Sequence, residues 1–429
     1  MKHLLPLVIS IFFYSCTAQS TDIDKHWPQW RGPSGSGEYH GSGLPLSWSE
    51  ESGILWKCES GPGNSTPIIW GDAVFLTSEH DQDLLLSRID KSTGKIVWTR
   101  KVGEAGNQLK HHAPHGDYNL ATPSPVTNGK VIIAHFGNGD LAAYDFKGNQ
   151  VWKRNLQEDN GVYTTKFGHS NSSVIHEDKV ISICIQDNLI ESQPDNLSES
   201  YIVAHNIKTG REIWKTLRMP DVEGEPCDSY VTPVLRTYDG KTEIIVMGAQ
   251  VLDAYDPEDG ERLWYLSGLS GNRVIPSPIV KDEWIYANTG FINDPALLAV
   301  KINGVGERPQ EVIVWKNEEK ISDSPSPVVW GDNLFTIDNR GFLQCLNRFD
   351  GSLTWSEKLE GFYRASPIVS DGRIYFLNME GQTTVIEASD SFKILSENQL
   401  KDKTLASPAV SEGMIFIRGD KHLYCLSTE

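Results

Sequence analysis

Hydrophobic and polar residues alternate in short runs along most of the chain, and turn residues separate the runs. The clearest example is residues 324–355, where the apolar runs are Pro327–Trp330, Leu334–Asp338, Phe342–Asn347 and Leu353–Trp355. Gly, Asp and Asn lie between these runs. Glycine adopts positive φ without a Cβ clash, and Asp and Asn tolerate left-handed geometry, so each cluster predicts a hairpin turn. The stretch therefore predicts one sheet of four short antiparallel strands.

This outline recurs in units along the chain. Each unit begins with Ser or Thr, usually followed closely by Pro, and most units end in Trp. The predicted starts are Ser65, Thr122, Ser172, Thr232, Ser277, Ser324, Ser366 and Ser407. Units of this length with four strands each are typical of the blades of a β-propeller. The pattern predicts an all-β fold with one sheet per unit.

The two ends of the repeat region complement each other. A lone strand ends at Trp56, and the unit that begins at Ser407 stops after three strands, at Leu426. If the first strand pairs with the last unit, the two segments complete one blade and the ring closes without open ends. We therefore expect an eight-bladed β-propeller of four-stranded antiparallel blades, closed by the N-terminal strand, with seven blades as the alternative.

The N-terminus has the pattern of an export signal. Lys2 precedes an apolar run over residues 4–14, which is shorter than the roughly 20 residues that span a bilayer. Cys16 follows a small residue and resembles the lipobox cysteine that is acylated; an ordinary signal peptide cut nearby is the alternative. We divide the chain into a lipoprotein signal peptide (1–15), an anchor linker and N-terminal extension (16–50) and a propeller (51–429).

The residues beside the lipidation site also bear on location. Thr17, rather than an acidic residue, follows Cys16, and by resemblance to known sorting rules this favours the outer membrane. We expect a lipid-anchored domain that faces the periplasm, with exposure at the cell surface as the alternative. Further along, Trp27–Pro33 holds two tryptophans in a Pro-bounded turn. Because exposed indoles are costly, we expect this turn to cover one end of the propeller core.

Composition narrows the functional classes. The formal net charge is −18, and Lys and Arg form no cluster, which argues against nucleic-acid binding. The six cysteines include Cys16, and the odd remainder of five argues against a full disulfide framework. A bridge between Cys58 and Cys425 stays open as a possibility, because ring closure brings their strands together.

A hallmark of the form D-x-x-T/D-G-x-x-x-W recurs at the fourth strands, as in Asp90–Trp98 and Asp256–Trp264. It resembles the repeat of pyrroloquinoline quinone (PQQ) type β-propellers over nearly the whole mature chain. The anchor, length and blade count are similar to the outer-membrane barrel-assembly-factor propeller family. That similarity implies a cofactor-free binding platform for envelope proteins. The Trp27–Pro33 opening and the insertions in blades two and three resemble a family of PQQ-like secreted proteins, which leaves the partner open.

Quinoprotein dehydrogenases form another branch of this superfamily. Their resemblance implies PQQ bound with Ca²⁺ over the central channel, typically between an adjacent Cys-Cys disulfide and a Trp. This sequence has no adjacent pair of cysteines, and its carboxylates match no metal-ligand or catalytic-base set of those enzymes. We therefore expect no cofactor, with PQQ and calcium as the alternative, and we assign no catalytic residue.

Candidate binding residues precede the first strand of several units. In a propeller the first strand of each blade lines the axis, so the residues just ahead of it meet at one mouth of the channel. The candidates are His169, Tyr230, Arg273, Asp323 and Arg364. Two Arg and one His suit an anionic or sugar-like ligand. The alternative is that these polar groups only hydrate the channel.

The loop over residues 109–118 is the densest histidine cluster in the chain. Imidazole and carboxylate groups can bind transition metals, but the spacing matches no zinc signature, so we expect no metal there. We expect instead that the loop folds over the channel mouth and brings His112 or His115 beside His169.

Three functional hypotheses follow from these observations. The sequence favours a lipid-anchored, non-catalytic, monomeric binding scaffold of the cell envelope, with outer-membrane protein assembly as its candidate role. The alternatives are a PQQ-dependent or related oxidoreductase acting on alcohols or sugars, and a carbohydrate-binding or polysaccharide-utilisation accessory protein. The expected partners are envelope proteins or a small polar or sugar-like ligand.

Overall fold

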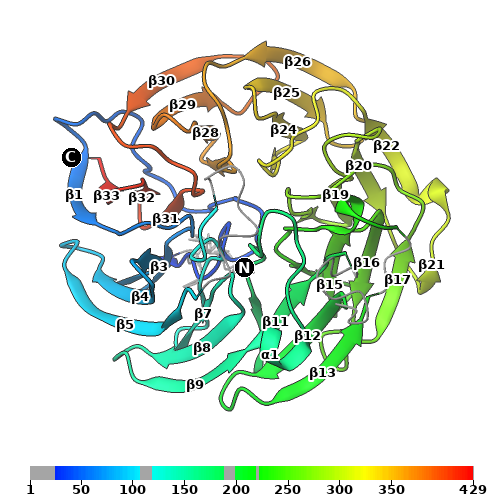
Figure 1. The fold of residues 1–429 in the computed structure, drawn as a ribbon. Helices are drawn as coiled ribbons and strands as arrows, with labels where there is room; N and C mark the ends of the chain where they lie inside the picture. The colour runs from blue at the N-terminus through cyan, green and yellow to red at the C-terminus, as the bar shows by residue number, and fades with distance from the viewer. Residues whose placement is uncertain (1–24, 107–117, 188–198, 219–221, 429) are drawn as a thin grey trace, which may run out of the picture.

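The computed structural model describes residues 25–106, 118–187, 199–218 and 222–428. Their strands form eight sheets arranged in a ring around a central axis (Figure 1). Each blade has four antiparallel strands, and one blade carries an additional short strand. The predicted eight-bladed propeller is confirmed, and the seven-bladed alternative is wrong. No helix among the described residues is long and apolar enough to cross a membrane.

Blades one to four follow one another along the chain, and the strands of each run in order from the axis outward. Blade one contains β2 (Ile68–Trp70), β3 (Ala73–His80), β4 (Asp83–Asp90) and β5 (Ile96–Glu104). Blade two contains β6 (Val126–Thr127), β7 (Val131–His135), β8 (Asp140–Asp145) and β9 (Gln150–Asn155). Blade three contains β10 (Val174–His176), β11 (Lys179–Cys184), β12 (Tyr201–Asn206) and β13 (Glu212–Leu217). Blade four contains β14 (Val234–Tyr238), β15 (Lys241–Gly248), β16 (Val251–Tyr255), β17 (Arg262–Leu266) and the added β21 (Gly306–Glu307).

Blades five to eight complete the ring. Blade five contains β18 (Ile279–Lys281), β19 (Trp284–Asn288), β20 (Leu297–Lys301) and β22 (Ile313–Asn317). Blade six contains β23 (Val328–Trp330), β24 (Asn333–Ile337), β25 (Phe342–Asn347) and β26 (Leu353–Lys358). Blade seven contains β27 (Ile368–Ser370), β28 (Arg373–Leu377), β29 (Gln382–Glu387) and β30 (Ile394–Gln399). Blade eight contains β31 (Ala409–Ser411), β32 (Met414–Arg418), β33 (His422–Leu426) and β1 (Ile54–Glu59).

The helical segments are short and lie in the connections between strands. The helix α1 (Leu156–Asn160) follows β9, and the side chain of Asn155 caps it by accepting hydrogen bonds from two backbone amides. Two 3-10 turns, η3 (Glu225–Cys227) and η4 (Gln310–Val312), precede β14 and β22. The turn η3 presents Glu225 at the channel mouth.

The first and last strands close the ring as predicted. Strand β1 pairs antiparallel with β33, so that Trp56 lies opposite Cys425 and Cys58 lies opposite Leu423. Both cysteines are free thiols. The bridge considered from the sequence is therefore not formed.

Six of the recurring Trp residues dock their blades on the next one. The indole N–H donates to a backbone carbonyl of the following blade in the pairs Trp56–Lys91, Trp98–Phe146, Trp152–Ile207, Trp214–Pro257, Trp315–Arg348 and Trp355–Ser389. The Gly of the repeat makes this contact possible. A Cβ at Gly351, where φ is +73°, would lie 2.7 Å from Cδ2 of Trp315. The recurring spacing of Gly and Trp along this chain is thus a blade-to-blade packing device.

Blade four departs from this pattern. The connection between β20 and β22 is long, and its strand β21 pairs in parallel with β17, placing Gly306 opposite Trp264. Arg308 extends the pairing by donating its amide to the carbonyl of Tyr265 at 2.7 Å. Trp264 is fully buried as a result, and its indole donates to the carboxylate of Glu243 rather than to the next blade.

A Ser or Thr within the first three residues of most units joins neighbouring blades near the axis. Its hydroxyl oxygen accepts a hydrogen bond from the backbone amide of the equivalent residue one blade earlier. These amide-to-hydroxyl pairs are Thr66–Ser124, Ser124–Ser172, Thr232–Ser277, Ser277–Ser326, Ser326–Ser366 and Ser366–Ser407. The motif that marked the blade starts in the sequence is therefore a structural link between blades.

Residues 25–45, which we call the strap, cross one end of the channel. The start of each first strand defines the mouth of the channel, and its far end defines the base. Trp27 is fully buried and exchanges backbone hydrogen bonds with Ile69 at the end of β2. Gly37 and Tyr39 bond in the same way to Val369 in β27. The prediction that the two-tryptophan turn covers an end of the core is confirmed, and that end is the base.

Candidate functional site

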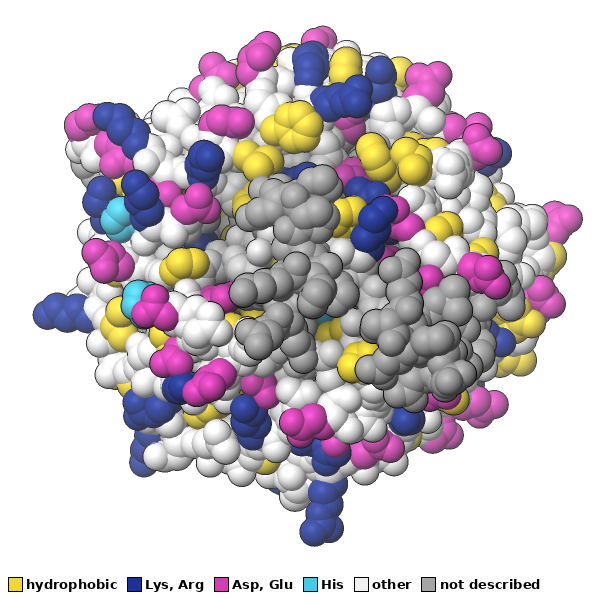
Figure 2. Space-filling model, in the orientation of Figure 1, with side chains coloured by type: hydrophobic (Ala, Val, Ile, Leu, Met, Phe, Trp, Pro, Cys, Tyr) yellow, Lys and Arg dark blue, Asp and Glu magenta, His cyan; other side chains and the backbone are white. Residues whose placement is uncertain are grey.

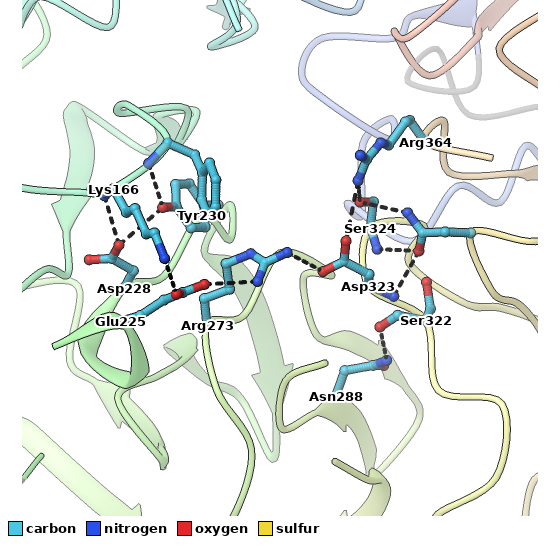
Figure 3. A network of polar contacts seen from close by, with 12 residues as sticks. Lys166, Glu225, Asp228, Tyr230, Arg273, Asn288, Ser322, Asp323, Ser324 and Arg364 are labelled. Carbon is cyan, nitrogen blue, oxygen red and sulfur yellow. Dashed lines mark hydrogen bonds and ion pairs between the residues drawn. The ribbon is translucent and has the colours of Figure 1, made fainter. Parts of the chain in front are cut away.

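The mouth of the channel brings together residues from five successive connections between blades. Four of the predicted residues lie there: Tyr230, Arg273, Asp323 and Arg364 (Figure 3). Lys166 and Glu225, which were not among the predicted residues, complete the group (Figure 3). Because all first strands run from mouth to base, each connection delivers its side chains to the same end of the ring.

Alternating charges link these connections into a chain of ion pairs, which we call the ladder. Lys166 Nζ lies 2.5 Å from Glu225 Oε2, and Arg273 Nη1 lies 2.9 Å from Glu225 Oε1. Arg273 Nη2 reaches Asp323 Oδ1 at 3.1 Å, and Arg364 Nη1 reaches Asp323 Oδ2 at 3.2 Å. Each carboxylate therefore has two cationic neighbours. The ladder ties the connections that precede blades three to seven to one another.

Asp323 is the most enclosed carboxylate of the ladder, with a side chain that is 8% exposed. The side-chain oxygen of Asn339 accepts hydrogen bonds from the amides of Asp323 and Ser324, which holds this connection in place. Burial raises the pKa of the Asp323 carboxyl, and the guanidinium groups of Arg273 and Arg364 oppose that rise. Arg364 Nη1 also donates to Ser324 Oγ at 2.9 Å.

A third carboxylate, Asp228, supports the ladder from within the protein. Its Oδ2 atom accepts from the hydroxyl of Tyr230 at 3.1 Å and from the amide of Lys166 at 2.8 Å. The Tyr230 hydroxyl in turn accepts from the amide of Phe167 at 3.1 Å. Burial raises the pKa of Asp228 to about 6. Asp228 and Glu225 were missed in the sequence, although both are acidic residues within five positions of the selected Tyr230.

Apolar side chains border the charged ladder on the same face. The Arg273 guanidinium lies 4.9 Å from the ring centroid of Phe167 and 5.5 Å from that of Phe291. The side chains of Val162, Phe291, Ile292 and Phe362 are 42%, 38%, 45% and 46% exposed, and all four belong to connections at the mouth. Yellow side chains lie beside dark blue and magenta ones near the centre of the face in Figure 2. We call these four residues the apolar rim.

The prediction that His169 faces the mouth with the other candidates is corrected by the structure. His169 is 1% exposed and stacks on Tyr163, with ring centroids 4.2 Å apart. Its ring also lies 4.9 Å from that of His135. Burial, and secondarily His135, lowers its pKa well below the usual value. The imidazole therefore packs against His135 of blade two and Tyr163, whereas Lys166 from the same connection reaches the ladder.

The other predicted histidines lie outside the described residues. His112 and His115 belong to residues 107–117, so their expected approach to His169 stays a prediction. Cys16, the expected lipidation site, also precedes the described chain.

One cluster of potential metal ligands occurs among the residues described. Donor atoms of His176, Glu177 and Glu258 lie within 4.8 Å of one another at the base. Lys179 Nζ, however, lies 3.1 Å from Glu258 Oε2 and 3.3 Å from Asp178 Oδ1. The Lys179 ammonium group therefore already neutralises carboxylate charge at the place where a metal ion would bind.

The donor set at the mouth does not fit a quinone with its metal ion. A divalent cation needs carboxylate oxygens that no other cation neutralises. Both ladder carboxylates, Glu225 and Asp323, instead contact two basic side chains each. Asp228 is buried and holds Tyr230. We therefore derive no reaction step through PQQ.

Comparison with known proteins places the chain in a family. The family model described as outer membrane protein assembly factor BamB matches residues 40–192 and 305–392, together more than half of the chain. The outer membrane protein assembly factor BamB of Shewanella oneidensis is 20% identical over 335 residues, which cover 75% of this chain and 75% of that protein.

Solved structures share the fold at lower identity. The crystal structure of BamB from Moraxella catarrhalis matches with a TM-score of 0.58 and 15% identity, covering 87% of this chain and 99% of that one. A europium-containing methanol dehydrogenase matches with a TM-score of 0.63 and 11% identity, covering 95% and 99%. At these identities the structures establish only the shared propeller. The family model covers enough of the sequence to decide membership: this chain belongs to the family of the outer membrane protein assembly factor BamB.

Proposed function

We propose that this protein is a lipid-anchored, non-catalytic propeller of the outer membrane that faces the periplasm and acts as a binding scaffold in outer-membrane protein assembly. Its membership of the BamB family supports this role, as do relatives whose names describe assembly factors. In this proposal Cys16 carries the lipid, and the propeller presents its mouth to other envelope proteins.

The ladder is the observation that carries the proposal. Acid–base catalysis needs a side chain that can exchange a proton with a substrate. At this mouth the side chains of Glu225, Arg273 and Asp323 instead form ion pairs with one another, and all three side chains are mostly buried. Such a network fixes the connections between blades and makes the mouth a rigid platform. Rigid surfaces lose little conformational entropy when a partner binds.

The apolar rim gives this platform its expected contact area. Exposed aromatic and aliphatic side chains beside charged groups are typical of protein interfaces, where a few apolar anchors contribute most of the binding energy. We propose that Phe291, Ile292 and Phe362 supply these anchors and that Arg364, whose side chain is 33% exposed, contributes a polar contact.

The test compares matched apolar substitutions in the bacterium that makes the protein. One variant carries Ile292→Ala and Phe362→Ala at the mouth, and the control carries Leu353→Ala, which is 53% exposed on β26 at the outer rim. We expect deletion of the protein and the mouth variant to lower the amount of folded β-barrel protein in the outer membrane. The control should retain the wild-type amount.

Chemical crosslinking of the intact envelope provides the second readout. The wild type and the Leu353→Ala control should capture an envelope protein, and the mouth variant should capture less of it. Unchanged β-barrel levels in the deletion strain, together with no crosslinked envelope protein, would refute the proposed role.

A further inference from the structure

The strap determines where the N-terminal tether meets the propeller. The carbonyl oxygen of Lys25 accepts a hydrogen bond from Ser411 Oγ at 2.6 Å, at the end of β31. The ring of His26 stacks on Trp70 with centroids 4.1 Å apart, and its Nδ1 accepts from the amide of Gly71 at 3.1 Å. All of these partners lie at the far ends of first strands. The chain therefore enters the ring at the base, close to the axis.

The strap is bound to the ring too extensively to move to another face. It contacts the first strands, or residues beside them, in blades one, two, five, six, seven and eight, through Ile69, Thr127, Lys281, Pro327, Val369 and Ser411. Arg31 is 1% exposed and donates to the carbonyls of Ser36 and Pro327, each at 2.6 Å. Glu38 accepts from Lys281 Nζ at 2.7 Å.

Glycines let the strap pack this closely. Gly32 has a φ of +81°, and a Cβ there would lie 2.7 Å from the indole of Trp27. Gly37 has a φ of +78°, and a Cβ there would lie 2.8 Å from the carbonyl oxygen of Pro367. Displacing the strap would expose Trp27 and leave the Arg31 guanidinium without these carbonyls.

The tether that precedes the strap is short. From Cys16 to Lys25 the chain advances about nine residues, which span at most roughly 30 Å when fully extended. Four strands spaced about 4.8 Å apart make a blade roughly 14 Å wide, and a five-residue strand is roughly 17 Å long. A tether that begins at the base would use its whole length in passing around a blade to the level of the mouth.

The turns at the base carry exposed charges of both signs, with Lys130, Lys147 and Lys208 among the basic ones, so charge alone does not attach this face to an anionic lipid surface. Exposed acidic side chains occupy the turns after most first strands, namely Asp72, Asp239, Asp332, Asp371 and Glu412. Negative charges are repelled by anionic headgroups within a Debye length. The orientation of the protein at a membrane therefore depends on the tether and its point of attachment.

From these observations we infer that the base faces the bilayer in the anchored protein and that the mouth, with its ladder and apolar rim, faces away from it. The mouth is then open to partners that approach from the aqueous side. This inference rests on the proposed lipid anchor at Cys16, and it adds to that proposal the side on which a partner binds.

Fluorescence energy transfer in proteoliposomes tests the orientation. The full-length lipidated protein, with Cys58→Ser to remove the partly exposed thiol, carries a donor dye at Asp332→Cys on the base or at Glu360→Cys at the mouth. The acceptor dye is attached to lipid headgroups. We expect a larger loss of donor emission at position 332 than at position 360. Equal losses, or a larger loss at position 360, would overturn the inference.

Two controls separate the tether from the anchor. A flexible Gly/Ser insertion of about 30 residues between Asp24 and Lys25 lengthens the tether, and should abolish the difference between the two dyes. A difference that survives the insertion would contradict an orientation set by tether length. A Cys16→Ser variant should lose vesicle association. If it stays bound, the proposed anchor is wrong, whereas a reversed order of the two dyes in a lipidated protein overturns only the orientation.

Discussion

Arg273 Nη2 lies 3.1 Å from Asp323 Oδ1, although the two residues are 50 positions apart in the sequence. They come from consecutive connections between blades, and the same guanidinium also pairs with Glu225. A single side chain thus joins the connections that precede blades four, five and six. These ion pairs hold the three connections together in the absence of any bound partner.

Removing that guanidinium should destabilise the propeller. Arg273→Ala leaves Asp323, 8% exposed, with one cationic neighbour instead of two, and we expect a loss of about 2–4 kcal/mol in the free energy of unfolding. Chemical denaturation followed by circular dichroism measures the loss. The double variant Arg273→Ala/Asp323→Ala should lose less than the sum of the single variants, because each one removes the same pair. Strict additivity would show that the two side chains are not coupled.

Two glycines in blade six allow the cost of the contact with Trp315 to be distinguished from the cost of backbone strain. Gly351→Ala should cost the strain of positive φ, about 1–2 kcal/mol, and a further ~1–3 kcal/mol from the clash with the indole. Gly331→Ala provides the control, because Gly331 has a φ of +58° and a Cβ added there would meet no atom within 4 Å. Thermal unfolding of both variants gives the comparison. Equal losses of stability would contradict the packing role of this glycine.

The serine links near the axis should tolerate Thr but not Ala. Ser366 Oγ accepts from the amide of Ser326 at 3.0 Å in a buried environment. Ser366→Ala leaves that amide unpaired, which costs about 1–3 kcal/mol. Ser366→Thr keeps the hydroxyl and should retain most of the stability, as Thr occupies the equivalent place at Thr66 and Thr232. A Thr variant as unstable as the Ala variant would show that the hydroxyl is not what the site requires.

Buried histidines should make the propeller sensitive to acid. Burial lowers the pKa of His135 to about 3 and of His205 to about 4, and it lowers that of His169 well below the usual value. Above about pH 6.5 these imidazoles are neutral in both the folded and the unfolded chain. As the pH falls below that value the unfolded chain binds protons first, so each histidine lowers the free energy of unfolding by about 1.4 kcal/mol per pH unit. This loss continues down to the folded pKa.

Asp228 acts in the opposite direction over part of that range. Its folded pKa of about 6 lies above the unfolded value, so protonation between about pH 6 and 4 favours the folded protein. Asp323, whose pKa burial also raises, acts in the same direction as Asp228. These two carboxyls cannot offset three histidines, and we expect stability to fall between about pH 6.5 and 4. Denaturation midpoints measured across this range test the prediction. His135→Gln/His169→Gln should flatten the decline, and an unchanged slope would contradict the assignment.

The repeated pattern of short strands, turn glycines and tryptophans was sufficient to predict the architecture. Strand β25 was predicted over its observed range, Phe342–Asn347, and β26 begins at the predicted Leu353 but continues to Lys358. The ring closure was also predictable, because an unpaired strand at Trp56 and a three-stranded last unit complement each other. Hairpins and blades are local, and their turns are specified by residues close together in sequence.

The candidate site was only partly predictable. Position ahead of a first strand identified Tyr230, Arg273, Asp323 and Arg364 correctly as mouth residues. The same rule misplaced His169, because a long connection can turn its side chains inward or outward without changing the strand that follows. Glu225 was missed because it lies on a 3-10 turn that no repeat position marks.

The sequence by itself determined the fold, because each blade repeats the same short-range residue pattern. That pattern is a Ser or Thr near the axis, turn residues between strands, and a Gly and a Trp at the contact with the neighbouring blade. Only the tertiary structure decided which connections exchange charge at the mouth and which end of the channel the strap covers. Those contacts join residues from different blades, and their partners are set by the curvature of the closed ring. The spacing of residues along the chain does not predict which residues of different blades come into contact.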